Sequence, residues 1–151
     1  MKPVTKSVLL WYSAQEMYEL VTGVESYPQF LPWCEGAQVL ERRDDGLTAR
    51  LSLAFAGVRT HFTTRNVHEA GRRVQVALVD GPFSHLDGDW QFKPLMRPGS
   101  DQANACKIQF EMRYAFANSA LEAVLSPVFD KVAQTFVDRF VARAEAVYGP
   151  R

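Results

Sequence analysis

Three polar side chains alternate along one short stretch of this sequence: His85, Asp87 and Asp89. On a β-strand they would share one face, and an imidazole beside two carboxylates is a combination that can bind a metal ion. The intervening positions include the large apolar residues Leu86 and Trp90. Because apolar side chains face the core and charged ones stay solvated, we expect the His-Asp-Asp face to point outward. We therefore predict neither a metal site nor a catalytic acid–base pair at these residues.

The two cysteines, Cys34 and Cys106, make no stronger case for catalysis. They lack the C-x-x-C spacing of redox and metal sites, and neither has a local histidine partner. In a chain without an export signal they are expected to be reduced, buried thiols. The glycine-rich fingerprints of nucleotide-binding loops are also missing from the sequence. The sequence thus predicts a protein that is not an enzyme and requires no cofactor.

Composition favours an apolar interior over a nucleic-acid surface. Of the 151 residues, 47% are hydrophobic and 12% aromatic, while Lys plus Arg and Asp plus Glu number 17 each. A general nucleic-acid binder would carry excess positive charge, so no DNA partner is expected. The apolar run from Val8 to Tyr12 is too short for a signal-peptide core, and no stretch is long enough to span a membrane. We expect a soluble, cytoplasmic, single-domain protein over residues 1–151.

The elements that must position any site follow from local patterns. Residues 3–11 form an expected strand, and Ser13 with Glu16 matches a capping box, so a helix should begin near Ser13 and stop at Gly23. A change to period two, with regular turn signals, then predicts six strands. These are residues 37–43, 47–56, 58–68, 72–80, 84–95 and 103–116. Short turns between them favour an antiparallel meander.

The last segment has helical spacing, with one wide apolar face running from Leu121 to Val147. Pro127 either kinks this helix or starts it afresh with Ser126 as the cap. One long apolar helix must bury its face on the one sheet available. The predicted fold class is therefore α+β: a curved antiparallel sheet of about seven strands wrapped around a long C-terminal helix, with two short helices after the first strand.

Three stretches carry a family resemblance: Tyr27–Cys34 (YPQFLPWC), Asp80–Phe92 (DGPFSHLDGDWQF) and Phe110–Phe116 (FEMRYAF). Their sequences and order resemble the helix-grip fold of the START-like superfamily. Within it they are similar to the coenzyme Q-binding and ribosome association toxin (RatA) family of polyketide cyclase/dehydrase and lipid transport proteins, whose bacterial members are also called oligoketide cyclases. The resemblance implies a deep apolar cavity between sheet and helix.

The lead functional expectation is therefore a carrier or chaperone that binds ubiquinone or a related isoprenoid lipid in support of respiration. Such a cargo would bring the protein into transient, peripheral contact with the inner membrane. Burial in an apolar cavity stabilises each methylene-sized group by roughly 0.8 kcal/mol. From the residues alone a solid core of the same side chains is the more usual arrangement, and the resemblance is what favours a cavity. The expected ligand-binding residues are Trp33, Phe55, Phe62, Phe83, Leu86, Trp90, Phe110, Met112, Phe129, Val132, Phe136 and Arg143.

Two of these assignments have plain structural alternatives. Arg143 could donate to a quinone carbonyl, or it could lay its stem on the core and extend its head to water. The segment Tyr27–Cys34 is expected to be either a lid or a hydrophobic plug at one end of the fold. For ligand entry we expect a mouth framed by Trp33, Phe83 and the first turn after Pro127.

The alternative function is a ribosome-associating, toxin-type factor that binds the large ribosomal subunit and blocks subunit association. It requires a basic surface, for which six arginines are candidates: Arg42, Arg43, Arg59, Arg65, Arg72 and Arg73. Acidic residues lie among them, so the field is mixed. A polyketide cyclase or aromatase is the third and weakest alternative.

Overall fold

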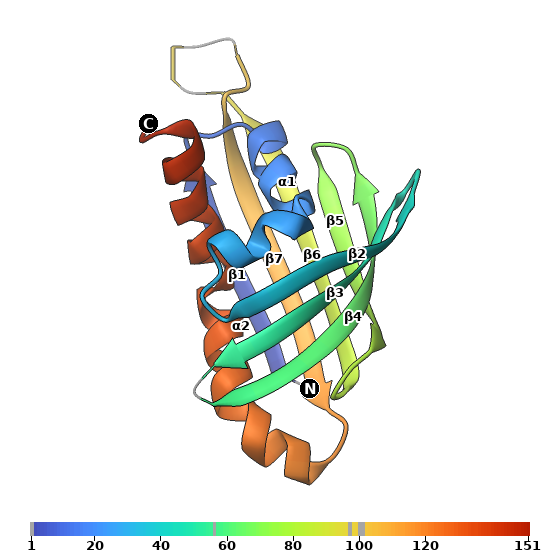
Figure 1. The fold of residues 1–151 in the computed structure, drawn as a ribbon. Helices are drawn as coiled ribbons and strands as arrows, with labels where there is room; N and C mark the ends of the chain where they lie inside the picture. The colour runs from blue at the N-terminus through green and yellow to red at the C-terminus, as the bar shows by residue number, and fades with distance from the viewer. Residues whose placement is uncertain (1, 56, 97, 100–101) are drawn as a thin grey trace.

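The computed structural model describes residues 2–55, 57–96, 98–99 and 102–151 (Figure 1). One sheet curves around one long helix, with the shorter helical segments at its open side. The elements in chain order are β1 (Lys2–Leu10), α1 (Ala14–Thr22), the 3₁₀ helix η1 (Val24–Gln29), β2 (Cys34–Arg43), β3 (Gly46–Phe55), β4 (Val58–Glu69), β5 (Arg73–Asp80), β6 (Phe83–Leu95), β7 (Ala105–Phe116) and α2 (Ser119–Tyr148).

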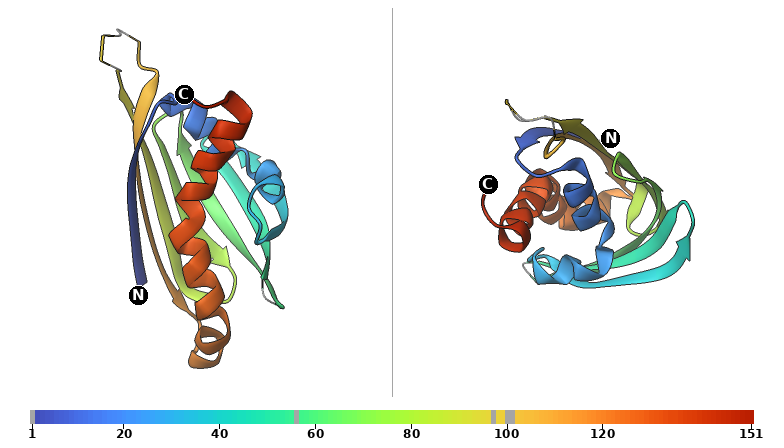
Figure 2. Two further views of the ribbon diagram at one scale, coloured as in Figure 1. Left: turned by 90° about the vertical axis from the view of Figure 1, so that its left-hand side faces the viewer. Right: turned by 90° about the horizontal axis from the view of Figure 1, so that it is seen from above.

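The seven-stranded sheet has the order β1-β7-β6-β5-β4-β3-β2, and all its neighbours are antiparallel. From β2 to β7 each strand pairs with the next, which confirms the predicted meander. β1 is the exception, because it lies beside β7 with Lys2 opposite Tyr114. Seen from above, the sheet bends around the helices (Figure 2). The predicted α+β helix-grip architecture is confirmed.

Helix α1 begins and ends where the local signals place its limits. The Ser13 side chain accepts from the Glu16 backbone N–H at 3.0 Å, and the Glu16 carboxylate accepts from the Ser13 N–H at 2.9 Å. This reciprocal pair satisfies two of the helix's free N-terminal donors. At the other end, the N–H of Gly23 donates to the carbonyl of Glu19 at 3.0 Å. The segment that follows is the short 3₁₀ helix η1, which includes Pro28 and is the second of the two short helices expected after the first strand.

Helix α2 is continuous through Pro127, so of the two predicted forms the structure has the kinked helix and not the fresh start capped by Ser126. The cap is Asn118, whose Oδ1 accepts from the N–H of Leu121 at 2.9 Å. Proline cannot donate to the carbonyl four residues back, and Figure 1 shows the first turns inclined to the rest of the helix. Burial of Leu125 and Phe129 on either side of the proline holds the two parts in one helix. No helix of the described residues is long and apolar enough to cross a membrane.

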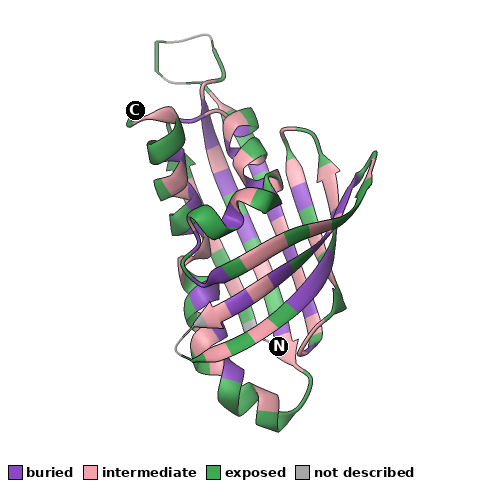
Figure 3. Cartoon of the chain, in the orientation of Figure 1, coloured by how far each residue is buried: buried purple, intermediate pink, exposed green. Residues whose placement is uncertain are grey.

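The helix and the sheet meet through aromatic side chains. The ring of Trp90 on β6 lies 5.7 Å from that of Phe136 and 5.2 Å from that of Phe140, measured between ring centroids. Along β6, buried residues alternate with more exposed ones (Figure 3), as a strand with one covered face requires. The expected burial of the apolar face of the C-terminal helix on the sheet is therefore confirmed.

Candidate ligand-binding cavity

A cavity of about 70 Å³ lies between the inner face of the sheet and α2. Side chains from α1, η1, the strands β3 to β7 and α2 line it, together with Trp33 just before β2. Nine of the twelve predicted ligand-binding residues are among them: Trp33, Phe62, Leu86, Trp90, Phe110, Met112, Phe129, Val132 and Phe136. The structure thus brings together most of the residues that the sequence singled out.

Three predicted residues are placed differently. Phe83 lies next to the main cavity and lines a smaller one of about 10 Å³ with Phe116 and Leu125. Arg143 does not line the cavity: its Nη2 donates to Oε1 of Gln29 at 2.9 Å, and its guanidinium lies 5.1 Å from the centre of the Phe30 ring. The head of Arg143 is thus held by Gln29 and Phe30 and not by a position in the cavity wall. The side chain of Phe55 lies outside the part of the chain that the structure describes.

The segment Tyr27–Cys34, which leads into β2, packs into the hydrophobic core. Leu31 and Trp33 are buried, and the Tyr27 ring packs edge-on against Phe140 at 5.4 Å. Its hydroxyl donates to the carbonyl of Val21. Trp33 packs against Phe136 at 5.9 Å, yet its indole Nε1 is buried without a hydrogen-bond partner among the described residues. The segment has the contacts of the plug alternative, and the Trp33 ring forms part of the cavity wall.

Two polar residues in the cavity were missed by sequence reasoning. Thr64 and Asn66 on β4 are 4% and 7% exposed, and both line the cavity. The signal was available: Phe62 was predicted to face inward, and period two places residues 64 and 66 on the same face. Their polarity argued for the outside. Gly88 also lines the cavity, between Leu86 and Trp90 on the inner face of β6.

The cavity offers little for acid–base chemistry. Tyr27 is the one titratable group among the described residues that line it. Burial raises the pKa of this phenol well above its usual range, so it stays protonated. The thiols of Cys34 and Cys106 are buried outside the cavity lining, and burial raises the pKa of each to about 11. A thiolate nucleophile is therefore scarce at neutral pH.

The alternating His85, Asp87 and Asp89 face outward, as predicted. Their side chains are 42%, 50% and 23% exposed, whereas Leu86 and Trp90 are buried. Asp89 accepts two hydrogen bonds from Arg73, at 2.9 and 2.7 Å. Among the described residues there is no cluster of three side chains arranged to hold a metal ion.

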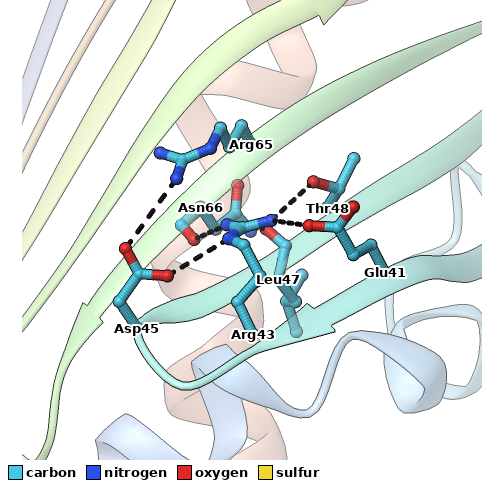
Figure 4. Close-up of polar contacts among 7 residues, drawn as sticks. All are labelled: Glu41, Arg43, Asp45, Leu47, Thr48, Arg65 and Asn66. Atoms are coloured by element: carbon cyan, nitrogen blue, oxygen red, sulfur yellow. Dashed lines mark hydrogen bonds and ion pairs between the residues drawn. The ribbon is translucent and has the colours of Figure 1, made fainter.

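The side chain of Arg43 forms hydrogen bonds across neighbouring strands, next to the polar cavity residue Asn66. Arg43 donates through Nε to Asp45, through Nη1 to Glu41 and Thr48, and through Nη2 to the backbone carbonyls of Leu47 and Asn66 (Figure 4). The distances are between 2.9 and 3.2 Å. All the N–H groups of this guanidinium are thus directed to the protein.

Solved structures of other proteins have a similar fold. A START superfamily protein from Mycobacterium smegmatis superposes with a TM-score of 0.78 at 20% identity, covering 96% of this chain and 98% of that one. The Zhui aromatase/cyclase from Streptomyces sp. R1128 gives a TM-score of 0.76 at 17% identity, covering 95% and 93%. The protein therefore has the helix-grip fold of the START-like superfamily.

Sequence comparison is more specific. The family described as "Polyketide cyclase / dehydrase and lipid transport" matches residues 10–141. The persistence and stress-resistance toxin PasT of Escherichia coli O6:H1 and the ribosome association toxin RatA of Escherichia coli K12 are each 39% identical over 151 residues, 100% of this chain and 92% of theirs. Coenzyme Q-binding protein COQ10 homolog B, mitochondrial, of Xenopus laevis is 27% identical over 146 residues, 96% of this chain and 59% of that protein.

The chain therefore belongs to the polyketide cyclase/dehydrase and lipid transport family, in the branch that contains the RatA and PasT toxins and, more distantly, the coenzyme Q-binding homologue.

Proposed function

We propose that this protein is a ribosome-associating factor of the RatA type. The observation that carries this proposal is the similarity to RatA and PasT, which extends at 39% identity over the whole chain. The sequence alone favoured a ubiquinone carrier, and this similarity supports the ribosome alternative better. In this function the protein binds the large ribosomal subunit and hinders its association with the small one.

The charged surface suggests where ribosomal RNA would be contacted. Binding to phosphates requires cations that are not already neutralised. Five of the six candidate arginines have a carboxylate partner within 4 Å: Arg42 with Glu25, Arg43 with Glu41 and Asp45, Arg59 with Glu35, Arg65 with Asp45, and Arg73 with Asp89. Arg72 has an exposed side chain and, within the described residues, no ion pair. It is the arginine of this group best able to bind a phosphate.

Sedimentation of ribosomes tests the proposal. Adding the purified protein to dissociated subunits should lower the yield of joined ribosomes, and the protein should migrate with the large subunit. Arg72→Glu should weaken this co-migration, whereas Lys131→Glu, an exposed lysine on α2, should not. If the wild-type protein migrates with neither subunit and leaves the ribosome profile unchanged, the proposed function is wrong.

We also propose that the cavity binds an uncharged, largely apolar small molecule of the isoprenoid quinone class. The lining supports this: its described residues include no charged group and are mostly aromatic and aliphatic. The similarity to a protein named as coenzyme Q-binding supports the ligand class. Ligand pockets usually measure about 300–1,000 Å³, so the present cavity of about 70 Å³ must widen around a quinone ring.

Extraction of the freshly purified protein into organic solvent, followed by mass spectrometry, tests this second function. Gly88→Val should abolish lipid recovery. A Cβ at Gly88 would meet no atom closer than 3.6 Å, and the rest of the side chain would occupy the cavity. Gly36→Val is the matched control: a Cβ there has its nearest contact at 3.8 Å, and Gly36 does not line the cavity. Equal lipid recovery from both variants would place any ligand elsewhere.

A further inference from the structure

Thr64 and Asn66 form a buried, hydrogen-bonded polar pair inside the cavity. The Thr64 hydroxyl donates to Oδ1 of Asn66 at 2.9 Å, and both side chains are more than nine-tenths buried. The Asn66 backbone is fixed from outside, because its carbonyl accepts from Arg43 at 2.9 Å (Figure 4). The pairing of β4 with β3 adds a second constraint, with Asn66 opposite Leu47. The carboxamide therefore has a defined position in the wall.

This carboxamide has a donor left over. An asparagine side chain carries one acceptor oxygen and an NH₂ with two donors. The oxygen is used by Thr64, while Nδ2 has no hydrogen bond to any described residue. Nδ2 is not among the fully buried side-chain atoms that lack a partner, so it keeps some accessible surface in the cavity that Asn66 lines. Buried donors are rarely left unpaired, because desolvation without a replacement bond is unfavourable. The other polar lining groups differ from this amide: the Tyr27 phenol and the Thr64 hydroxyl donate to protein acceptors, and the Trp33 indole N–H is fully buried. The Asn66 amide is therefore the unpaired polar group that best marks a point of ligand recognition.

We propose that Asn66 Nδ2 donates a hydrogen bond to a carbonyl or ether oxygen of the ligand, and that Thr64 positions the amide for this contact. The inference rests on the ligand-binding function proposed above and narrows its chemistry. The ligand is uncharged, because none of the lining groups that the structure describes can pair with a charge and the Arg43 guanidinium is fully engaged with protein acceptors. Its oxygen lies at the β4 wall, and its apolar body packs against the aromatic side chains of β6 and α2.

Two small probe molecules of nearly equal shape test the proposed hydrogen bond from Asn66, because only one of them can accept it. Acetophenone carries a carbonyl oxygen where α-methylstyrene carries a CH₂ group. Their dissociation constants would be measured from quenching of the tryptophan fluorescence, since Trp33 and Trp90 line the cavity. Asn66→Leu should weaken acetophenone binding about five- to tenfold, the equivalent of one net hydrogen bond. It should change α-methylstyrene binding less than about twofold, because that probe makes no such bond.

Thr63→Val is the matched control, since Thr63 is a buried neighbour on the same strand that does not line the cavity. It should leave both probes unchanged. A measurement on the unaltered protein guards against misfolding of the variant: the side-chain amide protons of Asn66 should shift downfield in ¹H–¹⁵N spectra with acetophenone and not with α-methylstyrene.

The outcomes separate this inference from the function on which it rests. Binding of both probes, with equal losses in Asn66→Leu and no selective amide shift, would overturn the role of Asn66 while leaving the cavity function standing. If neither probe binds the wild-type protein up to its solubility limit, the ligand-binding function and the Asn66 contact both fail.

Discussion

The two walls of the cavity differ in the size and polarity of their side chains. On the β6–β7 wall, the rings of Trp90 and Phe110 lie 5.7 and 5.8 Å from the Phe136 ring of α2. On the β3–β4 wall the lining residues beyond Leu51 and Phe62 are small or polar: Ala49, Thr64 and Asn66. The aromatic wall sets the distance of the helix from the sheet, and the side chains of the other wall are too short to fill that distance. The cavity is thus a consequence of unequal side-chain volume across one sheet.

The largest expected effect comes from breaking the aromatic wall. Trp90→Ala should lower the free energy of unfolding by about 3–5 kcal/mol, because it removes a buried indole that α2 packs against. Urea unfolding followed by circular dichroism measures the loss. Leu51→Ala on the opposite wall is the comparison and should cost less than half as much, since its surroundings already contain unfilled space. Equal losses would show that the two walls are equally well packed.

On the β4 wall we expect a substitution that raises the free energy of unfolding instead of lowering it. The double variant Thr64→Val/Asn66→Leu replaces both hydrogen-bonding partners by apolar groups of similar shape and removes the unpaired amide. We expect the free energy of unfolding of the ligand-free protein to rise by about 1 kcal/mol. The urea midpoint measures this gain. A loss comparable to that of Trp90→Ala would mean that the polar pair is needed for folding and not for a ligand.

The smallest effect concerns the outer face of the aromatic wall. Arg73 holds the pKa of the Asp89 carboxyl below its usual range through their hydrogen bonds. Asp89→Asn should cost about 0.5–1 kcal/mol at neutral pH, because the pair is partly exposed. A carboxyl with a lowered pKa stabilises the fold above its unfolded-state pKa, and this contribution is lost as the pH falls through the folded-state value.

Unfolding curves at neutral pH and in acid check this prediction. The difference between wild type and Asp89→Asn should shrink as the solution is acidified. A difference that stays constant over that range would mean that the pair contributes nothing through its charge.

Much of the architecture was predictable because its signals are local. The Ser13 capping box, the period-two strands and the apolar face of α2 each depend on neighbours a few residues away. At Pro127 the local rules left two outcomes open, a kink or a fresh helix start. The burial of Leu125 and Phe129 against distant strands decides for one kinked helix.

The candidate site was predictable in its apolar part only. Hydrophobic residues such as Phe62 and Phe110 on alternating positions identify the inner face from the sequence. Thr64 and Asn66 share that face, but their polarity argues for solvent unless their neighbours across the sheet are known. Arg143 was placed in the site because of its helical position, whereas its partners Gln29 and Phe30 lie in a segment more than a hundred residues away.

The strand order has a consequence for synthesis. β1 is made first, yet its partner is β7, with Leu10 opposite Cys106. From β2 onward each strand can pair with its predecessor as it emerges, but the backbone edge of β1, from Lys2 to Leu10, has no partner strand until β7 has been synthesised. Pairing across so long a separation is slow. A chain interrupted before β7 would therefore display an unpaired strand, the feature most prone to join another chain.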